Sequence, residues 1–292
     1  IYHVPLLMQS EMLDKVALRK LGLKDETSVS LHSWNDFLSR LKNPTSEVKI
    51  AVVGKYVELQ DAYKSIAEAF IHSGAANQCK VKVSWLQSEE IDSSNTKEKL
   101  KQFDGILVAP GFGDRGIEGK IEAVKYARTE KVPFFGICLG MQCAVIEYAR
   151  NVLNFTDAHT TEINPNTSNP VIDLMDHQKK VTDKGGTMRL GAYSCQVEED
   201  SKAFECYQKV NIKERHRHRY EFNNDYKEQL ESLGMKTTGL NPESNLVEII
   251  EVVEHPWFVG VQFHPEYKST VANPQPLFVG FIAAAITYSK QQ

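Results

Sequence analysis

The sequence predicts an α/β fold: a mostly parallel open sheet flanked by helices, with a nucleophile elbow and a short helical N-terminal linker. Short apolar runs alternate with amphipathic helical stretches from residue 48 to about residue 150, a rhythm typical of parallel strands with helices on both faces. One run ends in Gly136-Ile137-Cys138-Leu139-Gly140, the G-x-C-x-G layout of a turn that carries a nucleophile between a strand and a helix. The 292 residues suffice for one sizeable core with an appendage.

The first part of the chain is interpreted as a separate linker. Helical apolar spacing covers residues 8–21 and 34–41, and Asn43-Pro44 then breaks the pattern. The chain opens on an apolar extended stretch without an initiator Met, so we expect a piece of a longer polypeptide. The expected division is a linker over residues 1–47 and one α/β domain over residues 48–292.

The α/β domain is expected to contain at least six strands and six helices. Apolar runs predict strands at residues 48–53, 81–86, 105–108, 133–138, 246–252 and 258–263. Amphipathic spacing predicts helices at residues 61–72, 96–102, 117–129, 226–233 and 277–288, and one from residue 141. Residues 188–220 are expected to form strands around a short helix. The segment 155–186, rich in Asn, Pro, Thr and Asp, is expected to be a long ordered loop.

Composition excludes several classes of function. A net charge of −4 gives no drive toward nucleic acid or anionic membrane. The longest apolar stretch, residues 278–288, is too short to cross a bilayer, and no secretory leader is present at the start. The five cysteines are scattered and odd in number, which argues for reduced thiols in the cytoplasm and against a disulfide frame or a zinc site.

Cys138 is the candidate nucleophile. The flanking glycines allow a sharp bend in which side chains would clash. The turn aims a helix N-terminus at the sulfur, and such an N-terminus lowers a thiol pKa and offers N–H groups to an oxyanion. The alternative is a buried core thiol, because free cysteine is often buried. We interpret the other cysteines as structural: Cys79, Cys143, Cys195 and Cys206.

A thiol nucleophile needs a base and a group that orients the base. His264 is the strongest of nine histidines because it directly follows a predicted strand, and the carboxyl ends of strands form the active edge of an open α/β sheet. Glu266, two residues later, could hold His264 in one tautomer. His255 precedes its strand and has no carboxylate two residues on, so we reject it.

Residues 136–142 together with His264-Pro265-Glu266 resemble the class I glutamine amidotransferases. The resemblance narrows to the glutaminase domains of the CTP synthase family and covers nearly the whole chain. The segments that carry this narrower resemblance are 1–7, 113–120, 160–162, 185–191 and 214–220.

The resemblance implies roles for individual residues. Cys138 would attack the glutamine side-chain amide to give a thioester, with His264 as proton shuttle and Glu266 as its orienter. The backbone N–H groups of Gly111 and Leu139 would form the oxyanion hole. L-Glutamine would be bound by these residues: Gly111, Leu139, Gly140, Met141, Gln142, Glu162 and Arg219. A carboxylate and a guanidinium suit the α-ammonium and α-carboxylate of a free amino acid.

The resemblance also implies a larger enzyme, a glutamine-hydrolysing ligase of pyrimidine biosynthesis. Ammonia would pass to a synthetase domain of the same polypeptide that uses ATP and magnesium to aminate UTP to CTP. No Walker-type phosphate loop occurs here, so that domain is expected to be absent from this chain. The glutaminase domain would need no cofactor or metal, GTP would act as activator near Phe112 and Arg115, and the full-length family forms tetramers.

Two motifs have competing interpretations. Residues 111–116 fit G-x-G-x-x-G, but they follow the third strand and not the first, so an oxyanion loop is favoured over a dinucleotide site. Here Ala109-Pro110-Gly111 stands where the family usually has Pro-Gly-Gly, which alters the conformational freedom of that loop.

On a strand, Arg215, Arg217 and Arg219 point one way and His216 and His218 the other. A nucleic-acid patch, a solvated strand face and a metal site at the histidines are less favoured than glutamine binding.

Two functions compete with a glutaminase. One is a related thiol hydrolase of the γ-glutamyl hydrolase or small-peptidase type. Glu162 and Arg219 distinguish a glutaminase from such a hydrolase, because a free amino-acid substrate needs both residues and a peptide substrate would clash with them. The other is a non-catalytic regulatory module, against which the intact Cys138, His264 and Glu266 argue.

Overall fold

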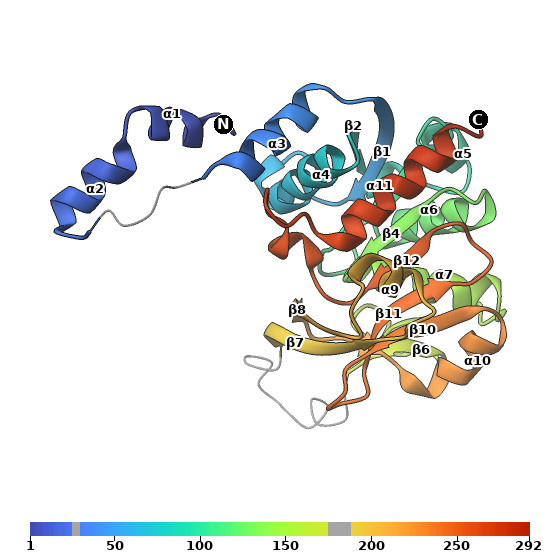
Figure 1. The fold of residues 1–292 in the computed structure, drawn as a ribbon. Coiled ribbons are helices and arrows are strands. Elements are labelled where there is room, and N and C mark those ends of the chain that lie inside the picture. The colour runs from blue at the N-terminus through green and yellow to red at the C-terminus, as the bar shows by residue number, and fades with distance from the viewer. Residues whose placement is uncertain (25–29, 175–187) are drawn as a thin grey trace.

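The computed structural model describes residues 1–24, 30–174 and 188–292 (Figure 1). Its central feature is a nine-stranded sheet in the order β2-β1-β3-β4-β12-β11-β10-β7-β8. The first five strands of this order pair in parallel: β1 (Ser46–Gly54), β2 (Cys79–Gln87), β3 (Gly105–Val108), β4 (Phe134–Ile137) and β12 (Phe258–Val261). The remaining strands extend the sheet in antiparallel fashion: β11 (Val247–Val252), β10 (Met235–Leu240), β7 (Arg189–Val197) and β8 (Asn211–His218).

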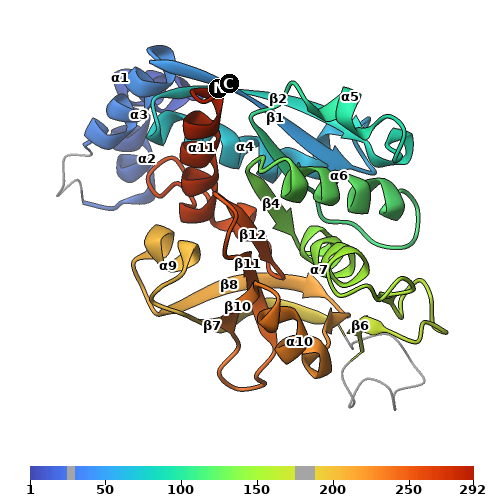
Figure 2. The same ribbon diagram turned by 90° about the vertical axis from the view of Figure 1, so that its right-hand side faces the viewer.

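Helices cover both faces of the parallel strands, which confirms the predicted α/β fold (Figure 2). Helices α6 (Ile117–Thr129) and α7 (Leu139–Asn151) pack on one face, and α4 (Lys64–Ala76) and α11 (Pro276–Ser289) on the other. Strand β1 shows why: its residues alternate, with Ala51 and Val53 in the first core and Ile50 and Val52 in the second. A strand buried on both faces reads as a continuous apolar run, as this one does.

The N-terminal residues form three helices: α1 (Val4–Ser10), α2 (Leu13–Leu21) and α3 (His32–Lys42). The single helix predicted for residues 8–21 is wrong, because the chain breaks at Met12, whose φ of 55° is left-handed. Helix α3 packs Phe37 and Leu38 against α4, whereas α2 buries none of its residues. Figure 1 shows α1 and α2 beside the α/β body.

The segment expected to be one long loop contains short strands. β5 (His159–Thr160) and β6 (Pro170–Asp173) join β9 (Glu221–Phe222) in a small second sheet. Strands of two to four residues are too short to leave a periodic signal. The rest of the expected loop, residues 175–186, lies outside the described residues. Strand β10 was also not predicted; its pairing is irregular around Gly239, and glycine is typical of such bulges.

Short helical segments complete the chain. In the described residues the remaining helices are α5 (Thr96–Leu100), α9 (Lys202–Tyr207) and α10 (Lys227–Ser232), and the 3₁₀ turns are η1 (Gln60–Tyr63), η2 (Ser88–Glu90), η3 (Asn224–Tyr226) and η4 (Pro265–Lys268). Within the described ranges, no helix has the length and apolar character needed to cross a membrane.

Candidate active site

Cys138 lies at a sharp turn between β4 and α7, with φ 53° and ψ −105°. Such a backbone conformation is strained for a residue with a side chain and is typical of functional turns. The glycines make the turn possible. A Cβ on Gly140 would lie 2.1 Å from the carbonyl oxygen of Val108, and one on Gly136 would lie 2.8 Å from the carbonyl of Gly140. The predicted nucleophile elbow is thus present in the structure.

The Cys138 side chain is 3% exposed and lines a narrow cavity. The other lining residues are Gly111, Phe112, Gln142, Glu162, Met188, His218, Arg219 and Tyr220. Four residues predicted to bind glutamine, from four separate segments of the chain, therefore meet at the thiol: Gly111, Gln142, Glu162 and Arg219. Cys138 thus packs against the hydrophobic core and also lines a cavity with charged and polar side chains, which argues against a purely structural cysteine.

His264 and Glu266 form a pair directly after β12. Nδ1 of His264 lies 2.8 Å from Oε1 of Glu266, and both side chains are buried. Nε2 of His264 is also buried and has no hydrogen-bond partner among the described residues. Burial alone would lower the pKa of His264, but the charges of the Cys138 thiolate and of Glu266 outweigh burial and raise that pKa to about 11. His264 therefore favours its imidazolium form.

The remaining predicted residues lie around this pair. Oε1 of Glu162 accepts a hydrogen bond from the backbone N–H of Gly113 at 3.3 Å. Leu139, Gly140 and Met141 form the first turn of α7 and are buried. Their side chains are not part of the cavity lining in the described structure. The first turn of a helix presents backbone N–H groups without partners in the helix, so these residues can act through the main chain.

A buried chain of amides also reaches the sulfur, and it was not predicted from the sequence. Nε2 of Gln142 donates to the carbonyl oxygen of Tyr220 at 3.0 Å and to Oε1 of Gln262 at 3.2 Å. Nε2 of Gln262 in turn lies 3.7 Å from Sγ of Cys138. Gln262 could have been identified from the sequence, because it stands two residues before His264, near the end of the same strand.

Two buried lysines hold the loop that follows β3. Nζ of Lys120, from α6, donates to the carbonyl oxygen of Ala109 at 2.6 Å. Nζ of Lys55, just after β1, donates to the carbonyl oxygens of Phe112 and Gly113. Neither lysine was predicted to have a role. A signal existed for Lys120, because it shares one helical face with the apolar residues 117, 121 and 124.

Strand β8 alternates as predicted: Arg215 and Arg217 are exposed, and His216 and His218 are buried. Nδ1 of His216 lies 2.7 Å from Nε2 of His218. The guanidinium carbon of Arg217 lies 5.8 Å from the centre of the Phe112 ring, which lines the cavity.

The two histidines belong to a buried charged cluster on the antiparallel side of the sheet. Arg189 contacts Glu248 at 2.8 Å and Glu221 at 3.2 Å. Burial raises the pKa of Glu221 to about 8 and that of Glu248 to about 7, although Arg189 opposes both shifts. Burial also lowers the pKa of His216 to about 3. The cluster therefore holds neutral histidines and carboxyls that titrate near neutral pH.

The other cysteines and the rejected histidine lie in different surroundings. All five thiols are free. Burial raises the pKa of Cys143 to about 11 and that of Cys206 to about 12, which makes both poor nucleophiles. His255 is buried, and its Nε2 lies 3.0 Å from the carbonyl oxygen of Ala127.

Comparison with known proteins gives a consistent picture. The family model described as glutamine amidotransferase class-I matches residues 58–284. CTP synthase of Cytophaga hutchinsonii is 61% identical over 290 residues, 99% of this chain and 54% of that protein. CTP synthase of Flavobacterium psychrophilum is 61% identical over 291 residues, again covering 54% of that protein. The chain thus spans about half the length of these curated relatives.

A solved structure with a similar fold is the glutaminase domain of Trypanosoma brucei CTPS with bound acivicin. It is 37% identical with a TM-score of 0.78, and the match covers 82% of this chain and 94% of that one. A protein from Thermoplasma acidophilum that is described as a GMP synthase subunit shares the fold alone, at 17% identity and a TM-score of 0.55, over 84% of this chain and 97% of that one.

Proposed function

The chain belongs to the class-I glutamine amidotransferases, and among them to the glutaminase domains of CTP synthase; from this premise we propose that it hydrolyses L-glutamine through a thioester on Cys138. The observation that supports the proposal most directly is that Cys138, Glu162 and Arg219 line one cavity. A nucleophile, a carboxylate and a guanidinium in one cavity suit a free amino acid with a reactive side-chain amide.

The chemistry follows from the pair at His264. The Cys138 thiolate attacks the amide carbon, and the resulting oxyanion accepts hydrogen bonds from the N–H groups of Gly111 and Leu139. His264 gives its proton to the leaving nitrogen, the C–N bond breaks, and ammonia departs from a γ-glutamyl thioester. Water then attacks the thioester while His264 takes a proton, and glutamate leaves as the thiolate reforms. Glu266 holds the imidazole in one orientation throughout.

Substrate recognition is assigned to three side chains. Glu162 would bind the α-ammonium of glutamine, Arg219 its α-carboxylate, and Gln142 its polar surface near the thiol. This assignment favours free glutamine over a glutamine within a peptide chain, whose blocked α-groups would leave a charge of the site without a partner.

The larger reaction belongs to a part of the protein outside this chain. We propose that the ammonia serves a fused synthetase domain that aminates UTP to CTP with ATP and magnesium, and that residues 1–47 connect to that domain. The match of this chain to about half the length of curated CTP synthases supports the proposal of a further domain. The glutaminase domain itself would carry no cofactor, and the full-length enzyme would be a homo-oligomer.

GTP is proposed as the activator, near Phe112 and Arg115. The Phe112 ring is 42% exposed at the cavity mouth, where it could stack on a base. The Arg115 guanidinium carbon lies 5.7 Å from the centre of the Tyr56 ring.

A cytoplasmic location is proposed because all five cysteines are free thiols.

Covalent labelling tests the proposed function. Acivicin, or a chloroketone analogue of glutamine, should add its mass to the peptide that contains Cys138, and L-glutamine should protect against it. Cys138→Ser should take no label. Ammonia release from glutamine, measured with and without GTP, provides the second readout. Faster cleavage of a γ-glutamyl peptide than of glutamine would favour the related hydrolase. An unlabelled wild type that releases no ammonia would leave only the regulatory module.

A further inference from the structure

Lys120 is a cation in an unusual place. It lies in the first turns of α6, on the face that packs against the sheet, and its side chain is fully buried. Lysine is almost never fully buried without a partner of opposite charge. In the described part of the chain no carboxylate lies within 4.0 Å of its Nζ. Its charge therefore needs another explanation.

Among the described residues, the hydrogen bond of its ammonium group goes to the turn that precedes Gly111. Nζ donates to the carbonyl oxygen of Ala109 at 2.6 Å. The next residue is Pro110, which has no N–H, so this carbonyl is the only polar group of its peptide unit. Gly111 lies close by: a Cβ built on it would be 3.6 Å from Nζ of Lys120, 3.4 Å from Cε of Lys55 and 3.5 Å from Cδ2 of Leu139.

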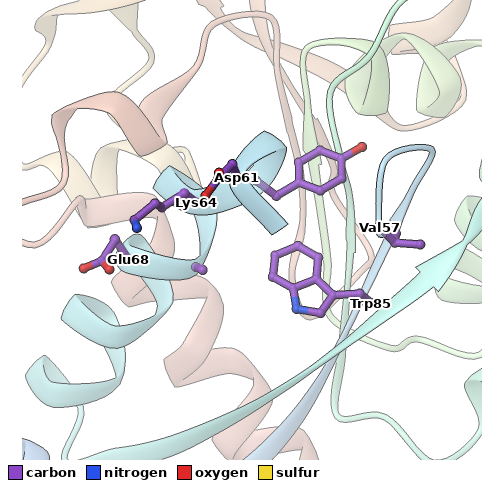
Figure 3. Close-up of a pocket in the computed structure, with 7 residues that line it drawn as sticks. Val57, Asp61, Lys64, Glu68 and Trp85 are labelled. Carbon is purple, nitrogen blue, oxygen red and sulfur yellow. The ribbon is translucent and has the colours of Figure 1, made fainter. Parts of the chain in front are cut away.

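A second side chain holds the neighbouring peptide unit. The hydroxyl of Tyr63 lies 3.4 Å from the carbonyl oxygen of Pro110. In a trans peptide the N–H points away from the carbonyl, so the N–H of Gly111 points away from Tyr63. Tyr63 itself stacks on Trp85 at the wall of a separate surface pocket (Figure 3). Lys120 and Tyr63 together fix the orientation of the Gly111 peptide.

The charge of Lys120 has thiols as its negative neighbours. Burial lowers the pKa of Lys120 to about 8, while the charges of Cys143 and Cys138 raise it and that of Lys55 lowers it. Cys143 is itself a poor thiolate, because burial raises its pKa to about 11. The negative charge that Lys120 can stabilise is therefore that of the reacting Cys138 sulfur and of the oxyanion that forms during the reaction.

We propose that Lys120 is a positioning residue of the amidase site: it anchors the 109–111 turn so that the Gly111 N–H meets the oxyanion, and it places a buried positive charge next to Gly111, which lines the same cavity as the Cys138 sulfur. The inference rests on the proposed glutaminase function for its substrate, but the thiol it acts on can be tested alone. It also accounts for how Ala109-Pro110-Gly111 can form an oxyanion loop, since the buried ammonium holds the Ala109 carbonyl oxygen, the one polar group of a peptide unit that has no N–H.

The first test compares Lys120→Met with Lys120→Arg and with Lys125→Met on the same helix. Lys120→Met should lower kcat for glutamine at pH 7 by at least about tenfold, with KM changed by less than about threefold, because the oxyanion contact acts in the transition state. Lys120→Arg should recover part of kcat, and Lys125→Met should match wild type. Equal kcat in Lys120→Met and wild type would overturn the proposal.

The second test needs no glutamine. The rate of Cys138 alkylation by iodoacetamide is measured from pH 5 to 10, with Cys138→Ser giving the background from the other thiols. Lys120→Met should react several-fold more slowly near neutral pH, and its half-maximal rate should move to higher pH. An unchanged profile would overturn the electrostatic role even in a chain that proved inactive toward glutamine.

Thermal unfolding separates this role from simple support of the fold. Lys120→Met removes a buried charge, so its Tm should equal or exceed that of wild type even though kcat falls. A Tm loss that accompanies the loss of kcat, with no recovery in Lys120→Arg, would mean that Lys120 only supports the fold and would overturn the proposal.

Discussion

The side-chain amide of Gln262 points its nitrogen at the sulfur of Cys138, 3.7 Å away. The oxygen of the same amide accepts a hydrogen bond from Gln142, which also donates to the backbone of Tyr220. This chain fixes which end of the Gln262 amide faces the sulfur. A neutral donor aimed at a thiolate stabilises the thiolate without competing for its proton.

Replacing Gln262 should therefore weaken the nucleophile. Gln262→Leu removes the donor and leaves Gln142 without one acceptor, so we expect kcat/KM for glutamine to fall about 10- to 100-fold, the worth of a buried hydrogen bond to a charged group. Steady-state ammonia release measures this. Gln229→Leu, on an exposed position of α10, is the control. Wild-type kinetics in Gln262→Leu would show that the contact between Gln262 and Cys138 does not contribute to catalysis.

The pKa of His264 should depend on Cys138. Because the thiolate and Glu266 raise it to about 11 against burial, Cys138→Ala should lower it by removing one of the two charges. Imidazole ¹⁵N NMR across pH 5 to 10 measures the titration. Wild-type His264 should stay protonated through neutral pH, and the variant should titrate at lower pH. A midpoint that does not move would contradict the ion pair.

The raised pKa of His264 also determines how the stability of the fold depends on pH. A histidine whose folded pKa is raised above about 6.5 contributes stability that is fully present below that pH and is lost as pH rises through the folded value. Cys138→Ala should therefore be less stable than wild type below about pH 6.5, and the difference should shrink as pH rises toward 11. Glu266→Gln should change in the same direction, and urea unfolding at several pH values compares all three.

The buried carboxyls should make the fold less stable as pH rises. Burial raises the pKa of Glu221 to about 8 and that of Glu248 to about 7, so their contribution is present below about pH 4.5 and is lost as pH rises through 7 to 8. Glu221→Gln should flatten the dependence between pH 5 and 8, by on the order of 2 kcal/mol across the range. Urea unfolding at each pH measures the slope, and Glu228→Gln, exposed on α10, should leave it unchanged.

The bond between His216 and His218 allows a crossed test. It joins Nδ1 of His216 to Nε2 of His218. An asparagine amide can replace Nδ1 and a glutamine amide Nε2, so His216→Asn and His218→Gln should keep the bond, whereas His216→Gln and His218→Asn should lose it. Because His218 lines the cavity beside Arg219, we expect the second pair to raise KM for glutamine about tenfold more than the first. Equal KM values in both pairs would separate this bond from substrate binding.

The features predicted best from the sequence are those decided locally. The turn at Cys138 was recognisable because two glycines bracket it, and His264 and Glu266 because a strand directly precedes them. Exposed and buried positions on β8 were predictable from the two-residue period of a strand. These features need no knowledge of distant partners.

Features that depend on distant contacts were not predicted. The apolar helical face of Lys120 indicates burial, but its contact with Ala109, eleven residues earlier and on another element, could not be predicted from the sequence. Gln262 meets Gln142 across 120 residues of chain. Likewise, β5 and β9 consist of two residues each, and their extended conformation comes from pairing with β6 rather than from their own sequence.

The contact between Gly140 and Val108 has a consequence for protein engineering. The first turn of α7 rests on the backbone carbonyl at the end of β3, and β3 continues directly into Ala109-Pro110-Gly111. The spacing between sulfur and donor loop is thus set by main chain touching main chain, with no side chain in between. Anyone who transplants this chemistry onto another scaffold has to carry β3 and α7 across as one unit, whereas the residues that select the substrate come from other segments and are open to exchange.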